Sequence, residues 1–191
     1  MIAKYKAIVL FLFLQTSVFS QDLGKAYFAG GCFWCMEESF EKKEGVLEVI
    51  SGYSGVTTKN PTYEEVTYGN TGHFETIEII FDKNKTNYND LLDHFWKNID
   101  PFDAYGQFCD KGYSYRSVAF YENDQQMGLI EKNIIKLEKK FNKKIVTYVR
   151  KFDKFYKAED NHQNYYEVKF LNYLRYKKAW VREKTLNKIF N

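Results

Sequence analysis

The chain has 191 residues, and 19% of them are aromatic, with 16 tyrosines and 17 phenylalanines. This length suits one domain with a substantial core, and the sequence contains no low-complexity tract. Lysine and arginine number 28 against 25 acidic residues, which gives a formal net charge of +3. So small an excess does not indicate nucleic-acid binding, and the basic cluster at 139–144 is typical of a solvated helix end.

The first twenty residues differ in composition from the rest of the chain. A short basic start precedes an apolar run from Ala7 to Leu14, and small residues end the segment at Ser20. We expect residues 1–20 to be a secretory signal peptide, so that residues 21–191 form one exported domain, periplasmic or secreted. The alternative is a membrane tether formed by an uncleaved N-terminus. The apolar run is too short to span a bilayer comfortably, so no stable span is expected after cleavage.

Strands and helices alternate along the mature chain. In chain order we expect a strand at 25–29, a helix at 33–43, a strand at 46–51, a loop at 52–61, a strand at 73–81, a helix at 87–98, a loop at 102–113, a strand at 115–121, a helix at 124–141 and a strand at 145–149. An irregular segment follows from Lys151 to about Asn161, and a helical, basic-aromatic tail begins at His162. The expected fold is α/β (α+β): a two-layer sandwich with a mixed sheet and packed helices, a ferredoxin-like core and a long irregular C-terminal segment.

The strand predicted at 73–81 has two unlike faces. One face carries His73, Glu75, Ile77, Ile79 and Phe81, and the other carries Phe74, Thr76, Glu78 and Ile80. The alternation therefore places Glu75 on the more apolar face, where burial would raise the pKa of its carboxyl group and keep it protonated near neutrality. A surface glutamate on a twisted edge is the alternative.

Two of the three cysteines lie in the sequence Gly31-Cys32-Phe33-Trp34-Cys35, at a predicted strand-to-helix junction. A helix N-terminus favours the thiolate, which is the nucleophilic form of cysteine. One helical turn separates the two sulfurs, which places them on one face within reach of a disulfide. We expect a redox pair with Cys32 as attacker and Cys35 as resolver. A structural disulfide or a metal site stays open, although only Cys109 and three scattered histidines could add metal ligands.

Several further motifs follow this stretch in order. They are Ser51–Gly55, Asn60–Val66, Thr71–Glu75, Phe95–Pro101, Gln107–Ser117 and Ala158–Gln163. Together with the cysteine motif they resemble the A-type peptide methionine sulfoxide reductases in their Cys-Phe-Trp-Cys variant, over most of residues 26–165. The resemblance implies one catalytic domain that reduces the S-epimer of methionine sulfoxide, free or in oxidised proteins, without a metal or a cofactor. We expect a monomer.

The resemblance also implies roles for individual residues. Cys32 attacks the sulfoxide sulfur, Glu75 protonates the oxygen, and Cys35 condenses with the resulting Cys32 sulfenic acid. An external, thioredoxin-like dithiol then restores the enzyme. The implied substrate-binding residues are Phe33 and Trp34 as the wall for the S-methyl group, Tyr63 and Tyr115 as partners of the sulfoxide oxygen, Asp110 at the pocket rim and His162 as a supporting residue.

Other interpretations of these residues remain open from the sequence. The aromatic residues are equally typical of a core, and His162 of a surface helix cap. Cys109 is either a second resolving cysteine or a small buried residue. A thioredoxin-type thiol–disulfide oxidoreductase would also place a Cys-x-x-Cys pair here, but it gives Glu75 no role. A non-catalytic binding module with a structural disulfide is a third class.

Overall fold

The structure is a computed structural model that describes residues 22–55, 58–178 and 181–190. The signal peptide predicted at residues 1–20 lies outside the described residues, and its cleavage stays a prediction. Within the described residues, no helix combines the length and the apolar character needed to cross a membrane.

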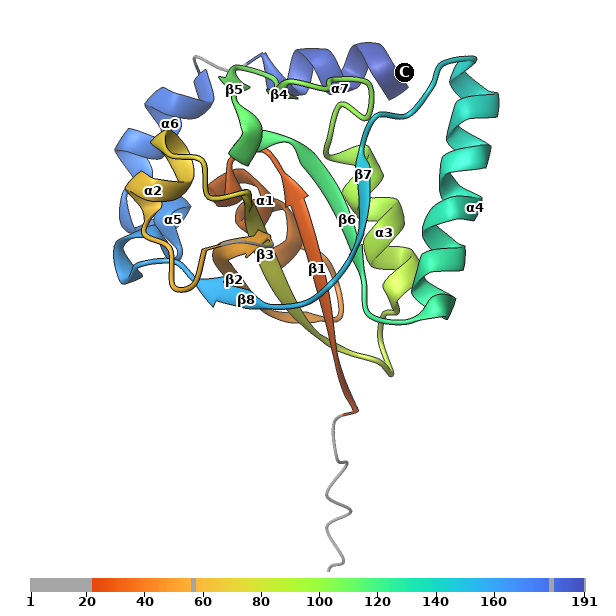
Figure 1. Cartoon of the computed structure of the whole chain (residues 1–191), viewed down its shortest axis with the longest axis horizontal. Coiled ribbons are helices and arrows are strands. Elements are labelled where there is room, and N and C mark those ends of the chain that lie inside the picture. Colours follow the sequence, from red (N-terminus) through yellow and green to blue (C-terminus); the bar gives the residue numbers. More distant parts are fainter. Residues whose placement is uncertain (1–21, 56–57, 179–180, 191) are drawn as a thin grey trace, which may run out of the picture.

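A six-stranded mixed sheet forms the centre of the fold (Figure 1). Its strands are β1 (Leu23–Gly30), β2 (Val46–Gly55), β3 (His73–Asp82), β6 (Ser117–Tyr121), β7 (Tyr148–Lys151) and β8 (Phe155–Lys157), in the spatial order β7-β6-β1-β3-β2-β8. The β6–β7 pair is parallel, and the other pairs are antiparallel. The inner order β6-β1-β3-β2 is that of a ferredoxin-like core, which confirms the predicted fold class.

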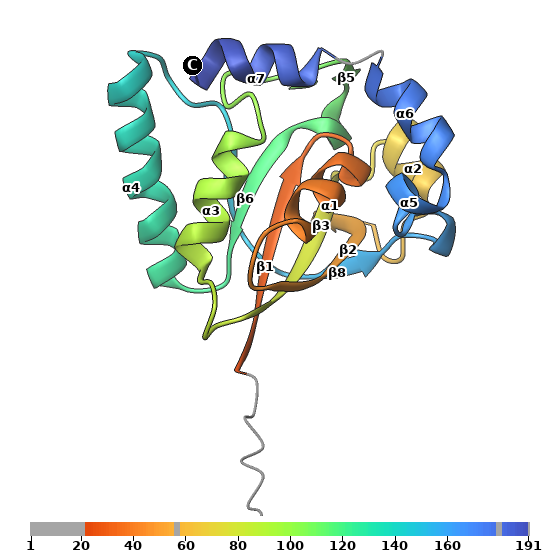
Figure 2. The same ribbon diagram turned by 180° about the vertical axis from the view of Figure 1, so that it is seen from behind.

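Seven α-helices accompany the sheet in the described part of the chain. They are α1 (Phe33–Glu41), α2 (Tyr63–Tyr68), α3 (Tyr88–Lys97), α4 (Asp124–Phe141), α5 (Tyr165–Val168), α6 (Phe170–Lys178) and α7 (Arg182–Phe190). Helices α1, α3 and α4 supply apolar side chains to one core cluster with the sheet, so they cover one of its faces (Figure 2). Two short strands, β4 (Gly106–Gln107) and β5 (Asp110–Lys111), form a separate hairpin.

Aromatic side chains fill both sides of the sheet. On the helix-covered face Phe28 of β1 is fully buried and stacks on Phe95 of α3, with ring centroids 4.7 Å apart. On the opposite face Tyr27 stacks on Phe152, at 3.6 Å, so the chain between β7 and β8 covers this side. Alternate residues of β1 therefore serve two different cores, as the period of a strand requires.

Several boundaries differ from those predicted. Helix α4 has the predicted bounds, whereas β2 continues to Gly55, beyond the predicted end at residue 51, because it pairs with β3 and with β8. The strand predicted at 145–149 starts at Tyr148, where pairing with β6 begins. The expectation of a long irregular C-terminal segment is wrong in part. The segment contains β8, and from Tyr165 onwards it is helical, as the predicted helical tail required.

Candidate active site

Cys32 lies where β1 turns into α1. The preceding Gly31 has a positive φ of +83°, and a Cβ atom there would lie 2.6 Å from the Cβ atom of Gln107, so only glycine fits. Cys32 is the N-cap residue of α1, and its carbonyl oxygen accepts the N–H groups of Cys35 and Met36. Its side chain is 4% exposed. The predicted placement of Cys32 at a strand-to-helix junction is therefore confirmed.

Glu75 reaches the same helix end from β3. Its carboxyl group is buried, and its Oε2 accepts a 2.9 Å hydrogen bond from the backbone N–H of Phe33. Burial raises the pKa of Glu75 to about 8, and the nearby acid Asp110 adds to this effect. The hydrogen bonds from Phe33 and Tyr115 act in the opposite direction but are outweighed. Glu75 is thus a protonated acid at neutral pH, and the alternative of a surface glutamate is wrong.

Four rings that were predicted to line the pocket lie together near the N-terminus of α1. The imidazole ring of His162 stacks on Tyr63, with centroids 4.4 Å apart, and lies 5.4 Å from Phe33 and 5.7 Å from Trp34. His162 is 7% exposed, so it is not a surface helix cap. Burial lowers the pKa of His162, which favours the neutral imidazole. These rings form an apolar wall at the start of α1.

Tyr115 and Asp110 come from the β4–β5 hairpin and the segment that follows it, and Tyr115 adjoins Tyr63 of the ring wall. Tyr115 ends a short 3-10 helix (Tyr113–Tyr115), and burial together with the neighbouring Glu75 raises the pKa of its hydroxyl group. Asp110 is partly buried, and its Oδ2 accepts a 2.9 Å hydrogen bond from Tyr176. The structure thus brings both predicted residues to the neighbourhood of Glu75.

Sequence reasoning missed one bridge that supports the ring wall at Tyr63. Both carboxylate oxygens of Glu159 are used: one accepts the Tyr53 hydroxyl at 2.8 Å, and the other accepts the backbone N–H of Tyr63 at 2.9 Å. Glu159 thereby ties the start of α2 to β2. The motifs Ser51–Gly55 and Ala158–Gln163 contain the two side chains, but nothing in either motif indicates that they meet.

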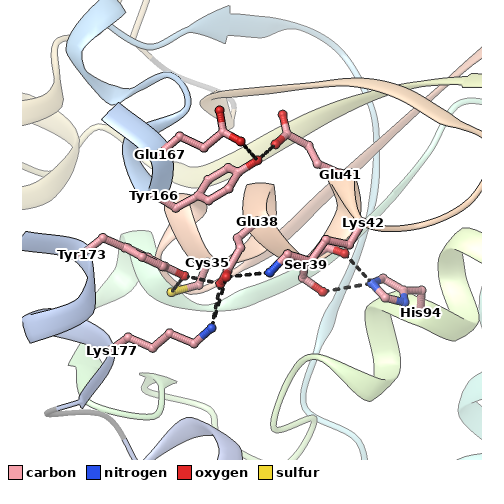
Figure 3. Close-up of polar contacts among 10 residues, drawn as sticks. All are labelled: Cys35, Glu38, Ser39, Glu41, Lys42, His94, Tyr166, Glu167, Tyr173 and Lys177. Atoms are coloured by element: carbon pink, nitrogen blue, oxygen red, sulfur yellow. Dashed lines mark hydrogen bonds and ion pairs between the residues drawn. The ribbon is translucent and has the colours of Figure 1, made fainter. Parts of the chain in front are cut away.

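The C-terminal helices supply a second missed group. Tyr173 of α6 lies with its hydroxyl oxygen 3.4 Å from the Cys35 sulfur and 2.6 Å from Oε2 of Glu38, as Figure 3 shows. Lys177 also contacts Glu38, at 2.9 Å. A cavity of about 650 Å³ adjoins Cys35 on this side, between α1, α3, α6 and α7. The C-terminal helices therefore adjoin the cysteine pair at Cys35.

The two thiols ionise as a pair. Burial raises the pKa of Cys32, and its hydrogen bond with Cys35 adds to the effect. Burial also acts to raise the pKa of Cys35, but the hydrogen bond with Cys32 and the charge of Arg182 outweigh it and lower the pKa overall. The charge of Arg182 and the hydroxyl group of Tyr173 thus favour a thiolate on Cys35.

Cys109 differs from the other two cysteines. It lies between β4 and β5 and is exposed, so it is not a small buried residue. None of the three cysteines forms a disulfide bond in this structure. Among the described residues, no group of three or more histidine, cysteine or acidic side chains gathers in a way that could hold a metal ion.

Comparison with known proteins gives consistent matches. The profile of the family described as "Peptide methionine sulfoxide reductase" matches residues 24–191. The "Peptide methionine sulfoxide reductase MsrA" of Streptococcus agalactiae serotype Ia is 48% identical over 146 residues, which are 75% of this chain and 86% of that protein. The crystal structure of Mxr1 from Saccharomyces cerevisiae in reduced form is 26% identical, with a TM-score of 0.70 over 76% of this chain and 84% of that one. The structure of Mxr1 in complex with Trx2 shares the fold, at 20% identity and a TM-score of 0.53 over 78% and 91% of the two chains.

Proposed function

The chain belongs to the peptide methionine sulfoxide reductase family and is a peptide-methionine (S)-S-oxide reductase, and we propose that Cys32, Glu75 and Cys35 carry out its reaction. One observation carries the assignment. A buried glutamic acid, Glu75, is protonated at neutral pH and is held at the N-terminus of α1 by the backbone N–H of Phe33, the residue that follows Cys32. A sulfoxide needs both a nucleophile for its sulfur and a proton for its oxygen.

In the first step the sulfoxide binds with its S-methyl group against Phe33 and Trp34. The Cys32 sulfur attacks the sulfoxide sulfur while Glu75 protonates the oxygen, with Tyr63 and Tyr115 as hydrogen-bond partners. The oxygen ends on Cys32 as a sulfenic acid, and the substrate leaves as methionine. Glu75 gives one proton to the oxygen, and the Cys32 thiol releases one proton when its sulfur attacks. The step therefore needs no added proton. The proton that Cys32 releases can pass through Cys35, because the two thiols share a hydrogen bond.

In the second step the Cys35 sulfur attacks the sulfenic sulfur. The S–S bond forms, the S–O bond breaks, and the hydroxyl group leaves as water. An external dithiol then reduces the Cys32–Cys35 disulfide and is itself oxidised. We propose a thioredoxin-like protein as this donor and oxidised proteins or free methionine sulfoxide as substrates, with the chain acting as a monomer. Yeast Mxr1, which shares the fold, has been solved in complex with Trx2.

The test uses both epimers of methionine sulfoxide, free and in a short peptide, with a dithiol as reductant. We expect methionine from the S-epimer in both forms and none from the R-epimer. Cys32→Ser should abolish the reaction, whereas a binding module would still retain its ligand in that variant. If no methionine came from the S-epimer, the proposal would be wrong.

We also propose that the protein is exported. The basic start, apolar run and small residues of residues 1–20 support this, and the donor would then be a periplasmic or membrane-relayed thioredoxin-like protein. N-terminal sequencing of the protein from the producing cells should begin after Ser20. A sequence that began at Met1 would argue for a membrane tether or for a protein that stays inside the cell.

A further inference from the structure

Helix α6 presents two tyrosines to the two cysteines of α1. Tyr173 lies with its hydroxyl oxygen 3.4 Å from the sulfur of Cys35, while Tyr176 hydrogen-bonds Asp110 at 2.9 Å and interacts with Cys32. The tyrosines are three residues apart, as are the cysteines, so each helix uses one face for the contact. The redox pair is therefore enclosed by a segment more than 130 residues away in the sequence.

Tyr173 is held firmly in this position (Figure 3). It is 2% exposed, and its hydroxyl group donates a 2.6 Å hydrogen bond to Oε2 of Glu38. Glu38 is in turn paired with Lys177 at 2.9 Å and with Lys42 at 2.7 Å. Burial acts to raise the pKa of Glu38, but these lysines and Tyr173 lower it to about 2. Glu38 is thus a permanent anion that fixes the orientation of the Tyr173 ring.

Arg182, the first residue of α7, brings a cation to the same side. It is 8% exposed, and its guanidinium group contacts the Met36 sulfur at 3.2 Å and the backbone carbonyl oxygen of Asn98. It also lies 4.9 Å from the centroid of the Phe108 ring. A buried cation favours a neighbouring anion strongly, because little water screens the interaction. Arg182 and Cys35 line the same cavity, and the charge of Arg182 favours the thiolate of Cys35.

We propose that Tyr173 and Arg182 are positioning residues that prepare Cys35 to resolve the Cys32 sulfenic acid. The inference deepens the proposed function and rests on it. While Cys35 is a thiol, the Tyr173 hydroxyl group donates its hydrogen bond to Glu38. When Cys35 becomes a thiolate, the same hydroxyl group can turn to the sulfur, and Arg182 balances its charge. The thiolate then attacks the sulfenic sulfur, the S–S bond forms and the S–O bond breaks, and the hydroxyl group takes up the proton that the Cys35 thiol released and leaves as water.

The test separates the two chemical steps in a single turnover. Reduced enzyme is mixed with the S-epimer of methionine sulfoxide and quenched at intervals. Methionine reports the first step, and mass spectrometry of trapped sulfenic acid and of the Cys32–Cys35 disulfide reports the second. For Tyr173→Phe we expect an unchanged rate of methionine formation and a disulfide rate lower by roughly tenfold, because a hydrogen bond to a charged sulfur is lost. The pH dependence of the second step should move to higher pH.

A matched control is Tyr166→Phe. It removes a hydroxyl group that binds Glu41 of α1, away from the cysteines, and it should leave both steps unchanged. Arg182→Met should slow the second step, and Arg182→Lys should restore part of the rate. If Arg182→Met failed to fold, the disulfide rate of Tyr173→Phe would still test the inference. Equal disulfide rates in Tyr173→Phe and the wild type would overturn the inference. Absence of methionine in the wild type would instead overturn the proposed function.

Discussion

The backbone N–H of Phe33 donates a 2.9 Å hydrogen bond to Oε2 of Glu75, across 42 residues of sequence. This contact fixes the acid at the start of α1, beside the thiol that the proposed reaction requires. It also uses one of the few N–H groups that a helix leaves free at its N-terminus. The helix end therefore holds the acid, while Arg182 and Tyr173 favour a thiolate on Cys35.

Replacing Glu75 with glutamine should slow the first chemical step by about 10²–10⁴-fold, the usual contribution of a positioned acid. The amide oxygen can still accept the Phe33 N–H, so the fold should survive. Methionine formation in a single turnover measures the rate. Glu78→Gln is the control, since Glu78 lies on the opposite face of β3, bound to Tyr27 and Lys25. A rate near that of the wild type in Glu75→Gln would remove the acid assignment.

The first step should slow as the pH rises through about 8, since Glu75 must carry its proton and its pKa is raised to about that value. This loss is expected in the single-turnover rate at saturating substrate, measured between pH 6 and pH 10. The slow residual rate of Glu75→Gln should not decrease over this pH range. A wild-type rate that stayed constant across this range would show that another group supplies the proton.

The Glu75→Gln substitution should also stabilise the fold at neutral pH. The folded state raises the pKa of Glu75 above its unfolded value of 4.5, so it favours the protonated form. The stability that Glu75 contributes is complete below pH 4.5 and is lost as the pH rises to about 8. Glutamine removes this dependence, which is worth about 3 kcal/mol at pH 7. Urea unfolding of the two proteins at pH 4 and pH 7 measures it, and an equal gain at both pH values would contradict it.

Resolution should occur at Cys35 and leave Cys109 free. After one turnover without a reductant, peptide mapping should find a Cys32–Cys35 disulfide in the wild type and a trapped Cys32 sulfenic acid in Cys35→Ser. Cys109→Ser should turn over at the wild-type rate with an external dithiol, because Cys109 lies in an exposed loop between β4 and β5. A Cys32–Cys109 bridge as the sole product would reverse the assignment.

Much of the site was predictable because local patterns encode it. The alternation along 73–81 placed Glu75 on the more apolar face, and Gly30-Gly31 followed by a helical pattern placed Cys32 at the start of α1. The ring wall around His162 came from the order of the motifs, because no periodic pattern relates Tyr63 to a residue about a hundred positions later. Individual boundaries, such as the end of β2, depended on pairing partners that the strand itself does not specify.

The amino-acid sequence by itself determined the class of the fold, the family and the identity of the sulfur and acid groups. Only the tertiary structure decided which groups surround each cysteine. Tyr173 and Cys35 are 138 residues apart, and a tyrosine in a basic-aromatic tail looks the same whether it faces solvent or a sulfur. The pKa of a thiol depends on burial and on charges within a few ångströms, and those distances exist only once α6 and α7 have packed against α1.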